Sequence, residues 1–230
     1  MIMTNTSDFS SEISLRFQAV WSSFGVPPRL EHASLDNYRP TCAEQERALQ
    51  KCRSYAANGL ENIARGHGLF LQGPVGTGKS HLVASVLRAM LVNNTGCFGK
   101  PPGRFNFVGE PVYTGYYCSM VSVIDLLGQL RESFSSDRMR LAAQQLMHRC
   151  RTNAVVVLDD IGAEKPTDWV EEQLYALIDL RYRMQRSTFF TTNCTMKELE
   201  VQIGSRSFSR IFEMCEGVRV GGEDWRKRGI

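Results

Sequence analysis

The eight residues from Gly73 to Ser80, with the sequence GPVGTGKS, have the types and spacing needed to bind a nucleoside triphosphate. They fit the phosphate-loop pattern Gly-x-x-x-x-Gly-Lys-Ser/Thr without a mismatch. Glycines let backbone N–H groups turn inward around a polyphosphate, and the start of the following helix directs its positive dipole end at the same anion. Lys79 is expected to neutralise the β- and γ-phosphates, and Ser80 to place its hydroxyl on Mg²⁺. The sequence therefore predicts a site for ATP or GTP together with Mg²⁺.

The setting of this loop supports the prediction. Residues 68–72 resemble a short buried strand, and apolar residues recur at helical spacing from Leu82 to Met90. A chance glycine-rich turn would not be expected in this strand–loop–helix order. The residues predicted to contact the nucleotide are Gly73, Pro74, Val75, Gly76, Thr77, Gly78, Lys79, Ser80 and His81. For His81 a plain position on the helix surface is the alternative, because no partner stands at metal-ligand spacing.

Two acidic residues end a second apolar segment. Residues 154–158 form a continuous apolar run rich in β-branched valine, which is typical of a strand buried on both faces of a parallel sheet. Asp159 and Asp160 follow directly. Asp159 is predicted to hold Mg²⁺, partly through ordered water, and Asp160 to orient or deprotonate the attacking water. A helix cap or a solvated turn is the alternative, which the upstream phosphate loop disfavours.

Three polar residues nearer the C-terminus are further candidates for chemistry. Asn193 follows the strand predicted at 187–191, and polar residues at the carboxyl end of such a strand face the ligand crevice. It is a candidate for positioning the hydrolytic water, although asparagine is also common in turns. Arg206 and Arg210 stand four residues apart on one helical face. They form either a solvated basic face or an arginine finger for a neighbouring subunit's γ-phosphate.

The elements that must position these residues alternate between strands and helices. Strands are predicted at 68–72, 116–121, 154–158 and 187–191, and helices at 79–92, 123–134, 139–150 and 170–181. This alternation predicts a three-layer α/β domain with a parallel sheet and right-handed crossovers. The domain is expected at 25–230, after a short polar tail at 1–24. A Gly/Pro-rich insertion at about 93–115 resembles a surface hairpin more than a core element.

Composition narrows the class of protein. With 43% hydrophobic and 22% charged residues, the 230-residue chain has the make-up of an ordinary globular protein. Its apolar runs stay below the roughly 18–20 residues needed to cross a bilayer, and its polar start lacks a secretion signal. Seven scattered cysteines without a Cys-x-x-Cys pair favour free thiols in a reducing cytosol. We therefore expect a cytoplasmic protein without a membrane anchor.

Several of these segments together resemble the DnaC/IstB branch of the AAA+ ATPases. The matching segments are GVPPR at 25–29, SLDNY at 34–38, the loop at 73–80, DDIGAE at 159–164, TTN at 191–193 and the spaced SR pairs at 205–210. The resemblance covers about residues 25–228. It implies that Asp159 is the Walker B acid and that Asp160 stands where many AAA+ proteins have glutamate. It also implies that Asn193 is sensor 1 and that Arg210 is the arginine finger, with Arg206 as the alternative.

The same resemblance implies partners. Members of this branch load bacterial or phage replicative helicases, or assist the transposition of insertion sequences. It therefore implies a homo-oligomeric ATPase, slow until stimulated, that contacts single-stranded DNA and a helicase or a transposase. A nucleotide switch with negligible turnover is an alternative of a different class. A small-molecule kinase is disfavoured, because Asn193 and the helix with Arg206 and Arg210 would have no clear role in it.

Three features depart from the family pattern. Helicase loaders usually carry a helicase-binding region before the ATPase core, whereas about two dozen residues precede Gly25 here. The insertion at 93–115 is longer than expected at that connection, and its role is unassigned. The sequence stops at Ile230, so no C-terminal helical lid domain is expected. Arg226 is then only a weak candidate for a sensor-2 arginine.

Charge alone does not predict DNA binding, because the net charge is only +3. Local basic clusters are present at Arg138/Arg140, Arg149/Arg151 and Arg226-Lys227-Arg228. Phe134 has two interpretations: it stacks on a base or, at its helical spacing, packs in the core.

Overall fold

The fold is a five-stranded parallel sheet between two layers of helices. A computed structural model describes residues 17–94, 97–98, 104–105, 111–112 and 116–227. The strands lie in the order β4-β5-β6-β1-β7. Their bounds are β4 Cys118–Ser122, β5 Val155–Asp159, β6 Ser187–Thr192, β1 Gly68–Gln72 and β7 Cys215–Arg219. Every pairing is parallel, so the carboxyl ends of all five strands meet at one edge of the sheet.

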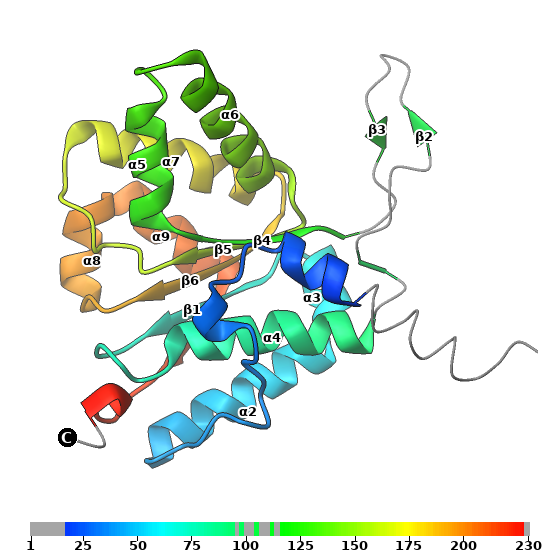
Figure 1. The fold of residues 1–230 in the computed structure, drawn as a ribbon. Coiled ribbons are helices and arrows are strands. Elements are labelled where there is room, and N and C mark those ends of the chain that lie inside the picture. The colour runs from blue at the N-terminus through cyan, green and yellow to red at the C-terminus, as the bar shows by residue number, and fades with distance from the viewer. Residues whose placement is uncertain (1–16, 95–96, 99–103, 106–110, 113–115, 228–230) are drawn as a thin grey trace, which may run out of the picture.

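Helices cover both faces of this sheet (Figure 1). One face is covered by α2 (Ala43–Ala57), α3 (Gly59–Ala64) and α4 (Lys79–Asn93), and the other by α5 (Val123–Glu132), α6 (Asp137–Thr152), α7 (Asp168–Arg183), α8 (Met196–Ile203) and α9 (Ser205–Met214). Alternate residues of each strand supply the two cores. In β1, Leu69 and Leu71 pack toward α2 and α4, and Phe70 packs toward α9. The predicted three-layer α/β architecture is confirmed.

The strand β7 and the short helix α8 are absent from the prediction. Only Val218 of β7 is buried, so this edge strand lacks the apolar run that marks β5. Among the described residues, β7 pairs with β1 alone. Its partner requires a glycine at the first position: a Cβ on Gly68 would lie 1.8 Å from the carbonyl oxygen of Thr188.

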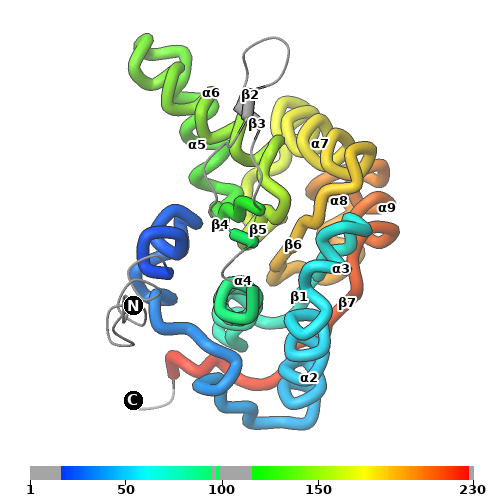
Figure 2. Tube along the Cα trace, turned by 90° about the vertical axis from the view of Figure 1, so that its right-hand side faces the viewer, coloured from blue at the N-terminus to red at the C-terminus, as the bar shows by residue number. Residues whose placement is uncertain are grey.

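The packed domain begins before Gly25. Residues 17–23 are helical, and Val20, Trp21 and Phe24 lie in the core beside α4. The amide of Met120 in β4 donates to the carbonyl of Phe24 over 2.6 Å, which ties this segment to the sheet. Figure 2 shows α4 between the N-terminal segment and α2. The predicted tail at 1–24 was therefore too long at its C-terminal end, because the scattered aromatic residues of this polar stretch belong to a packed helix. Residues 1–16 lie outside the described residues.

The predicted insertion is only partly a surface element. β2 (Arg104–Phe105) and β3 (Pro111–Val112) form an antiparallel pair apart from the main sheet (Figure 1). The prediction of a hairpin is consistent with this pair. Phe98, however, is fully buried and packs on Phe24 and Tyr116, so the prediction that the segment avoids the core was wrong at this residue.

One buried arginine joins the elements that carry the acidic residues. Arg181 of α7 is completely buried and donates to the carbonyls of Cys150 (2.8 Å), Asn153 (2.9 Å) and Ser187 (2.6 Å) and to the hydroxyl of Thr188 (2.8 Å). Burial lowers the pKa of its guanidinium to about 9. These bonds link the end of α6 to the starts of β5 and β6. They therefore hold the two strands whose other ends form the candidate site.

Phe134 lies on the surface of the domain. Phe134, just beyond α5, is 82% exposed, so the prediction of core packing for it was wrong. The helical period that suggested a buried position ends at Glu132.

In the described ranges, each helix is too short or too polar to cross a membrane.

Candidate nucleotide-binding site

A cavity of about 1000 Å³ lies at the carboxyl edge of the sheet, beside the start of α4. Strands β1, β5 and β6 deliver the phosphate loop, Asp159 with Asp160, and Thr191 with Asn193 to its wall. The N-terminal segment closes another side with Arg29 and Tyr38. The crevice rule for parallel sheets, which the sequence argument applied to Asn193, is consistent with the position of this residue at the carboxyl edge.

The phosphate loop has the backbone shape that its glycines were expected to provide. Gly76 and Gly78 adopt positive φ angles of 78° and 90°, which other residues rarely tolerate. No side chain caps the start of α4, so its first N–H groups remain for an anion. Tyr38 supports the loop, since its hydroxyl donates to the carbonyl of Thr77 over 2.9 Å. A Cβ on Gly78 would lie 2.6 Å from the same ring, so Tyr38 also requires a glycine there.

Lys79 is held at the wall of the cavity by three oxygen atoms. Its ammonium donates to the carbonyls of Gly73 (2.8 Å) and Pro74 (2.7 Å) and to Oδ1 of Asn193 (2.6 Å). The residue is 6% exposed. Burial lowers the pKa of Lys79 to about 8, although Asp160 and Asp159 act in the opposite direction. A phosphate carries more negative charge than these acceptors, so Lys79 is positioned to turn toward one.

Asp159 and Ser80 form a pair of oxygen donors suited to a hard cation. The hydroxyl of Ser80 lies 2.8 and 3.0 Å from the two carboxylate oxygens of Asp159, and the hydroxyl of Thr191 donates to Oδ1 over 2.6 Å. No cluster of three or more His, Cys, Asp or Glu side chains among the described residues could hold a metal by itself. Two protein oxygens beside a phosphate site fit Mg²⁺, which keeps most of its waters and is bound through substrate phosphates.

Asp160 is held in an unusual backbone conformation next to this pair. Its φ of 61° lies in the left-handed region, which costs energy for a residue other than glycine. Its amide donates to the hydroxyl of Thr191 over 2.8 Å, and the Asn193 amide group donates to its Oδ1. Desolvation, and then the charge of Asp159, raise the pKa of Asp160, while Lys79 and Arg29 lower it. A carboxylate with a raised pKa is a better proton acceptor.

Asn193 thereby joins two groups of opposite charge. Its carbonyl oxygen accepts from Lys79 and its amide nitrogen donates to Asp160. The structure brings together the residues predicted for the phosphate, the metal and the water, with Asn193 at their centre. The sequence argument gave no role to Thr191, which contacts both aspartates, although this residue begins the TTN segment that resembles the family.

His81 does more than occupy the helix surface. It lines the cavity, its ring packs 5.6 Å from that of Tyr38, and its Nε2 lies 3.3 Å from the carbonyl oxygen of Ser34. Desolvation lowers the pKa of this imidazole. A neutral ring on Tyr38 is suited to packing beside a nucleotide rather than to binding its phosphates.

The C-terminal segment also reaches the cavity. The Trp225 amide donates to the carbonyl of Gly76 over 3.0 Å, and Arg226 lines the cavity while its Nε lies 3.1 Å from Asp224. The sequence offered Arg226 only as a weak candidate, whereas the fold places it near Lys79, whose pKa it lowers. Arg228 of the same basic cluster lies outside the described residues.

Arg206 and Arg210 do not line this cavity; they lie on α9, against α7. Arg210 pairs with Asp179 over 2.7 Å, and its guanidinium carbon lies 4.7 Å from the ring centre of Tyr175. Its side chain is 24% exposed, so the interpretation as a plain solvated face does not describe it. Arg206 is exposed and lies 6.0 Å from the same ring centre.

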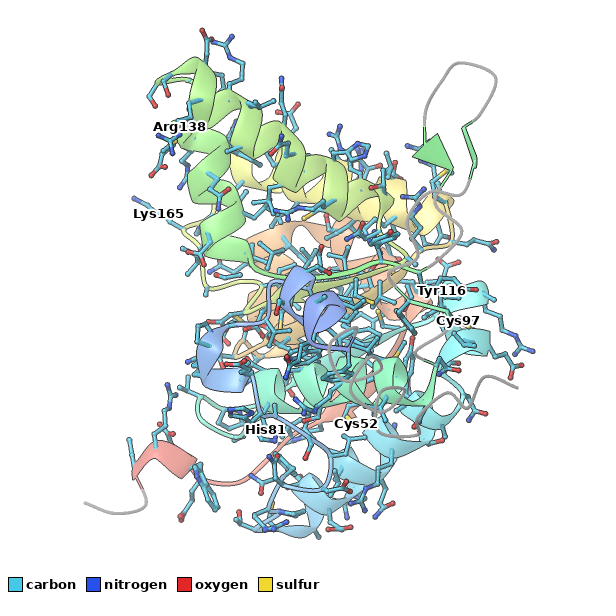
Figure 3. All side chains as sticks on the ribbon, turned by 45° about the vertical axis from the view of Figure 1, so that its right-hand side comes forward. Cys52, His81, Cys97, Tyr116, Arg138 and Lys165 are labelled. Atoms are coloured by element: carbon cyan, nitrogen blue, oxygen red, sulfur yellow. The ribbon has the colours of Figure 1, made fainter. Side chains whose placement is uncertain are left out.

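The two predicted basic clusters on α6 do not line the cavity. Figure 3 shows Arg138 at the outer end of α6, whereas His81 marks the cavity at α4. Arg140 of this cluster pairs with Asp137 over 3.2 Å. The basic residues of α6 therefore form a surface separate from the phosphate loop.

Comparison with known proteins gives a consistent assignment. The sequence model of a family described as IstB-like ATP binding protein matches residues 31–229. The replicative helicase loader DnaC of Escherichia coli (strain K12) is 24% identical over 212 residues, which cover 92% of this chain and 73% of that protein. The replicative helicase loader DnaI of Bacillus subtilis (strain 168) is 26% identical over 176 residues, 70% of this chain and 48% of that protein.

Solved structures agree with the sequence comparisons. A crystal structure of the DnaC helicase loader has a TM-score of 0.66 and 27% identity, and the match covers 84% of this chain and 99% of that one. A structure of the replication initiator DnaA bound to AMPPCP and single-stranded DNA has a TM-score of 0.60, with 86% of this chain and 51% of that one covered. Its identity is only 14%, so this likeness concerns the fold alone.

Proposed function

Because the chain belongs to the family of IstB-like ATP binding proteins, we propose that it is an ATP-hydrolysing AAA+ protein that loads a replicative helicase onto DNA. The observation that carries the proposal is the connection from Lys79 through Asn193 to Asp160, with Ser80 and Asp159 beside it. It combines a phosphate-binding cation, a polar side chain and a proton acceptor at one wall of the cavity. A site that only stored a nucleotide would not need the last two.

Each residue has a defined role in this proposal. The loop and Lys79 bind the phosphates of ATP, and Ser80 and Asp159 hold Mg²⁺, which supplies charge neutralisation at the β- and γ-phosphates. Asn193 orients the attacking water and Asp160 accepts its proton. The strained backbone of Asp160 supports this role, because such conformations persist where the surroundings fix a side chain for function.

Arg210 is proposed as the arginine finger in trans. It lies outside its own chain's cavity, so only a neighbouring subunit of a homo-oligomer could receive it. Its ion pair with Asp179 and its contact with Tyr175 would hold the guanidinium in one place on α9. Arg206, which is exposed on the same helix, is the alternative finger.

The helicase is proposed as the partner because relatives that match over most of this chain are named replicative helicase loaders. Single-stranded DNA would lie on the basic residues of the oligomer, among them Arg138 on α6. Binding dominated by backbone phosphates should weaken steeply with salt and show little sequence preference. The exposed Phe134 is available to stack on a base. The protein would work in the cytoplasm, where replication takes place.

A loading assay tests this proposal. The purified protein is mixed with the replicative helicase of the same cell, circular single-stranded DNA and ATP, and DNA-bound helicase is measured by gel filtration. We expect loading with wild-type protein and none with Lys79→Ala. If the protein neither binds the helicase nor changes the amount of helicase on DNA, the helicase-loader proposal is wrong.

The family description favours a second candidate, an ATP-dependent helper of DNA transposition. The same protein is then tested for nucleotide-dependent binding to a transposase encoded beside it. Binding to the transposase without binding to the helicase would support this second candidate. A third outcome, tight ATP binding with negligible turnover in the presence of DNA and either partner, would identify a nucleotide switch.

A further inference from the structure

The cavity contains a cation that no phosphate-binding motif includes. Arg29 lines the same cavity as Lys79 and Asp160, yet it comes from the N-terminal segment rather than from the sheet. Its positive charge lowers the pKa of the Asp160 carboxylate, which lines the same cavity.

The donors of Arg29 remain available. Within the described ranges its guanidinium makes no hydrogen bond or ion pair; its one interaction is the electrostatic attraction of Asp160. The residue is exposed toward the cavity. A guanidinium offers five N–H donors in a fixed plane, and that geometry suits a phosphate group.

The segment that carries Arg29 is rigid. Pro27 and Pro28 begin the short helix η1 (Pro28–Leu30), and proline fixes φ at both positions. Leu30 is buried in the core, and the carbonyl of Glu31 accepts a 2.8 Å hydrogen bond from Arg88 of α4. Upstream, the carbonyl of Phe24 accepts from Met120 of β4. The backbone around Arg29 is thus attached to two elements of the domain that border the cavity.

We propose that Arg29 is a nucleotide-binding residue that contacts the terminal phosphate of ATP within its own chain. This inference rests on the proposed function, because it requires ATP in the cavity. It assigns the GVPPR segment a chemical role: the two prolines hold an arginine over the phosphate end of the site. ADP lacks the group that Arg29 would contact, so the arginine would distinguish the two nucleotides.

Direct binding measurements test the proposal. Affinities of a non-hydrolysable ATP analogue and of ADP, each with Mg²⁺, are measured for wild type, Arg29→Ala and Arg29→Lys. We expect Arg29→Ala to weaken binding of the ATP analogue by about 10- to 100-fold, the usual effect of losing charged hydrogen bonds, and ADP binding by less than about threefold. Arg29→Lys should recover only part of the ATP affinity, because it restores the charge without the planar fork.

The matched control is Arg47→Ala, which removes an exposed arginine of α2 that does not line the cavity. It should leave both affinities at the wild-type values. Thermal melting of Arg29→Ala should match wild type, since this side chain is exposed. Equal losses for ATP analogue and ADP would mean that Arg29 contacts another part of the nucleotide, and would overturn the inference, as would unchanged ATP affinity. Wild-type protein that binds no ATP would instead refute the proposed function.

Discussion

We predict that the charge of Lys79 makes ATP affinity depend on pH between pH 7 and pH 9. The Lys79 residue is 6% exposed, and burial lowers the pKa of its ammonium from 10.5 to about 8. In the free protein the charge is therefore present below pH 8 and is lost as pH rises through that value. A bound polyphosphate stabilises the charged form and holds the pKa of Lys79 higher. Protonation and nucleotide binding are thus linked, and affinity must fall above pH 8.

The size of the change in ATP affinity follows from the pKa of Lys79. With a value of about 8, roughly nine-tenths of the free protein carries the charged lysine at pH 7 and about one-tenth at pH 9. The apparent Kd for ATP should therefore rise about tenfold between pH 7 and pH 9, which corresponds to about 1.4 kcal/mol. Binding at pH 8.5 should take up about 0.75 protons per nucleotide, against about 0.1 at pH 7. Phosphate groups ionise near pH 6, so ATP itself contributes little over this range.

Calorimetry measures both quantities. ATP is titrated into the protein at pH 7, 8, 8.5 and 9, in two buffers of different ionisation enthalpy, with Mg²⁺ and again with a chelator. Lys79→Arg is the control, because arginine stays charged throughout and its binding, however weak, should not vary with pH. A wild-type Kd that stays constant from pH 7 to pH 9 without proton uptake would refute the reasoning, since Lys79 would then keep its charge in the free protein.

Four further outcomes are expected. Asp160→Asn should retain ATP affinity and slow ATP hydrolysis, whereas Lys79→Ala should abolish tight ATP binding. Hydrolysis at the wild-type rate by Asp160→Asn would exclude Asp160 as the water-activating group. The rate of ATP hydrolysis per protein should rise with protein concentration. Mixing Lys79→Ala with Arg210→Ala should restore part of the activity, because the first variant keeps the arginine and the second keeps the nucleotide site. Folded variants that show no rescue would exclude Arg210 as a finger in trans. Single-stranded DNA should bind more tightly with ATP and less tightly with salt in fluorescence anisotropy, and binding that ignores both would count against DNA handling. Arg181→Met should lower stability in urea unfolding by about 3–5 kcal/mol, since it removes three hydrogen bonds to buried acceptors and one to the part-buried Asn153 carbonyl, while the exposed Arg183→Met should change it by about 0.5 kcal/mol or less. Equal losses would show that the hydrogen bonds of Arg181 contribute little.

Sequence patterns were sufficient wherever the determining interactions are local. The phosphate loop needs two positive φ angles, a lysine and a hydroxyl within eight residues, and the sequence GPVGTGKS contains the glycines, the lysine and the serine that provide them. The run at 155–158 is buried on both faces, so its composition identified a central strand without knowledge of its neighbours. Because polar groups gather at the carboxyl ends of parallel strands, the positions of Asp159 and Asn193 could also be inferred.

Other features depend on which segments the fold brings together. Asn193 contacts Lys79 across 114 residues of sequence, and that contact depends on β6 lying beside β1. The strand β7 carries a single buried residue, so only its pairing with β1 identifies it. Phe98 and Trp21 lie in polar surroundings in the sequence, yet they are buried because α4 and β4 leave an apolar surface for them to cover.

The arginine side chains show most clearly which properties the sequence determines and which depend on tertiary packing. Their sequence spacing placed Arg206 and Arg210 on one helical face, but the partners of Arg210, Asp179 and Tyr175, come from α7. The sequence marked the GVPPR segment only by its resemblance to the family and gave Arg29 no role, and nothing in the sequence distinguished Arg181 from a surface arginine. The charge of a side chain is a property of its residue type, whereas its burial and its partners are set by packing between distant elements. The sequence by itself therefore determined that this protein binds a nucleotide through Lys79, and only the tertiary structure placed Arg29 and Arg226 in the same cavity.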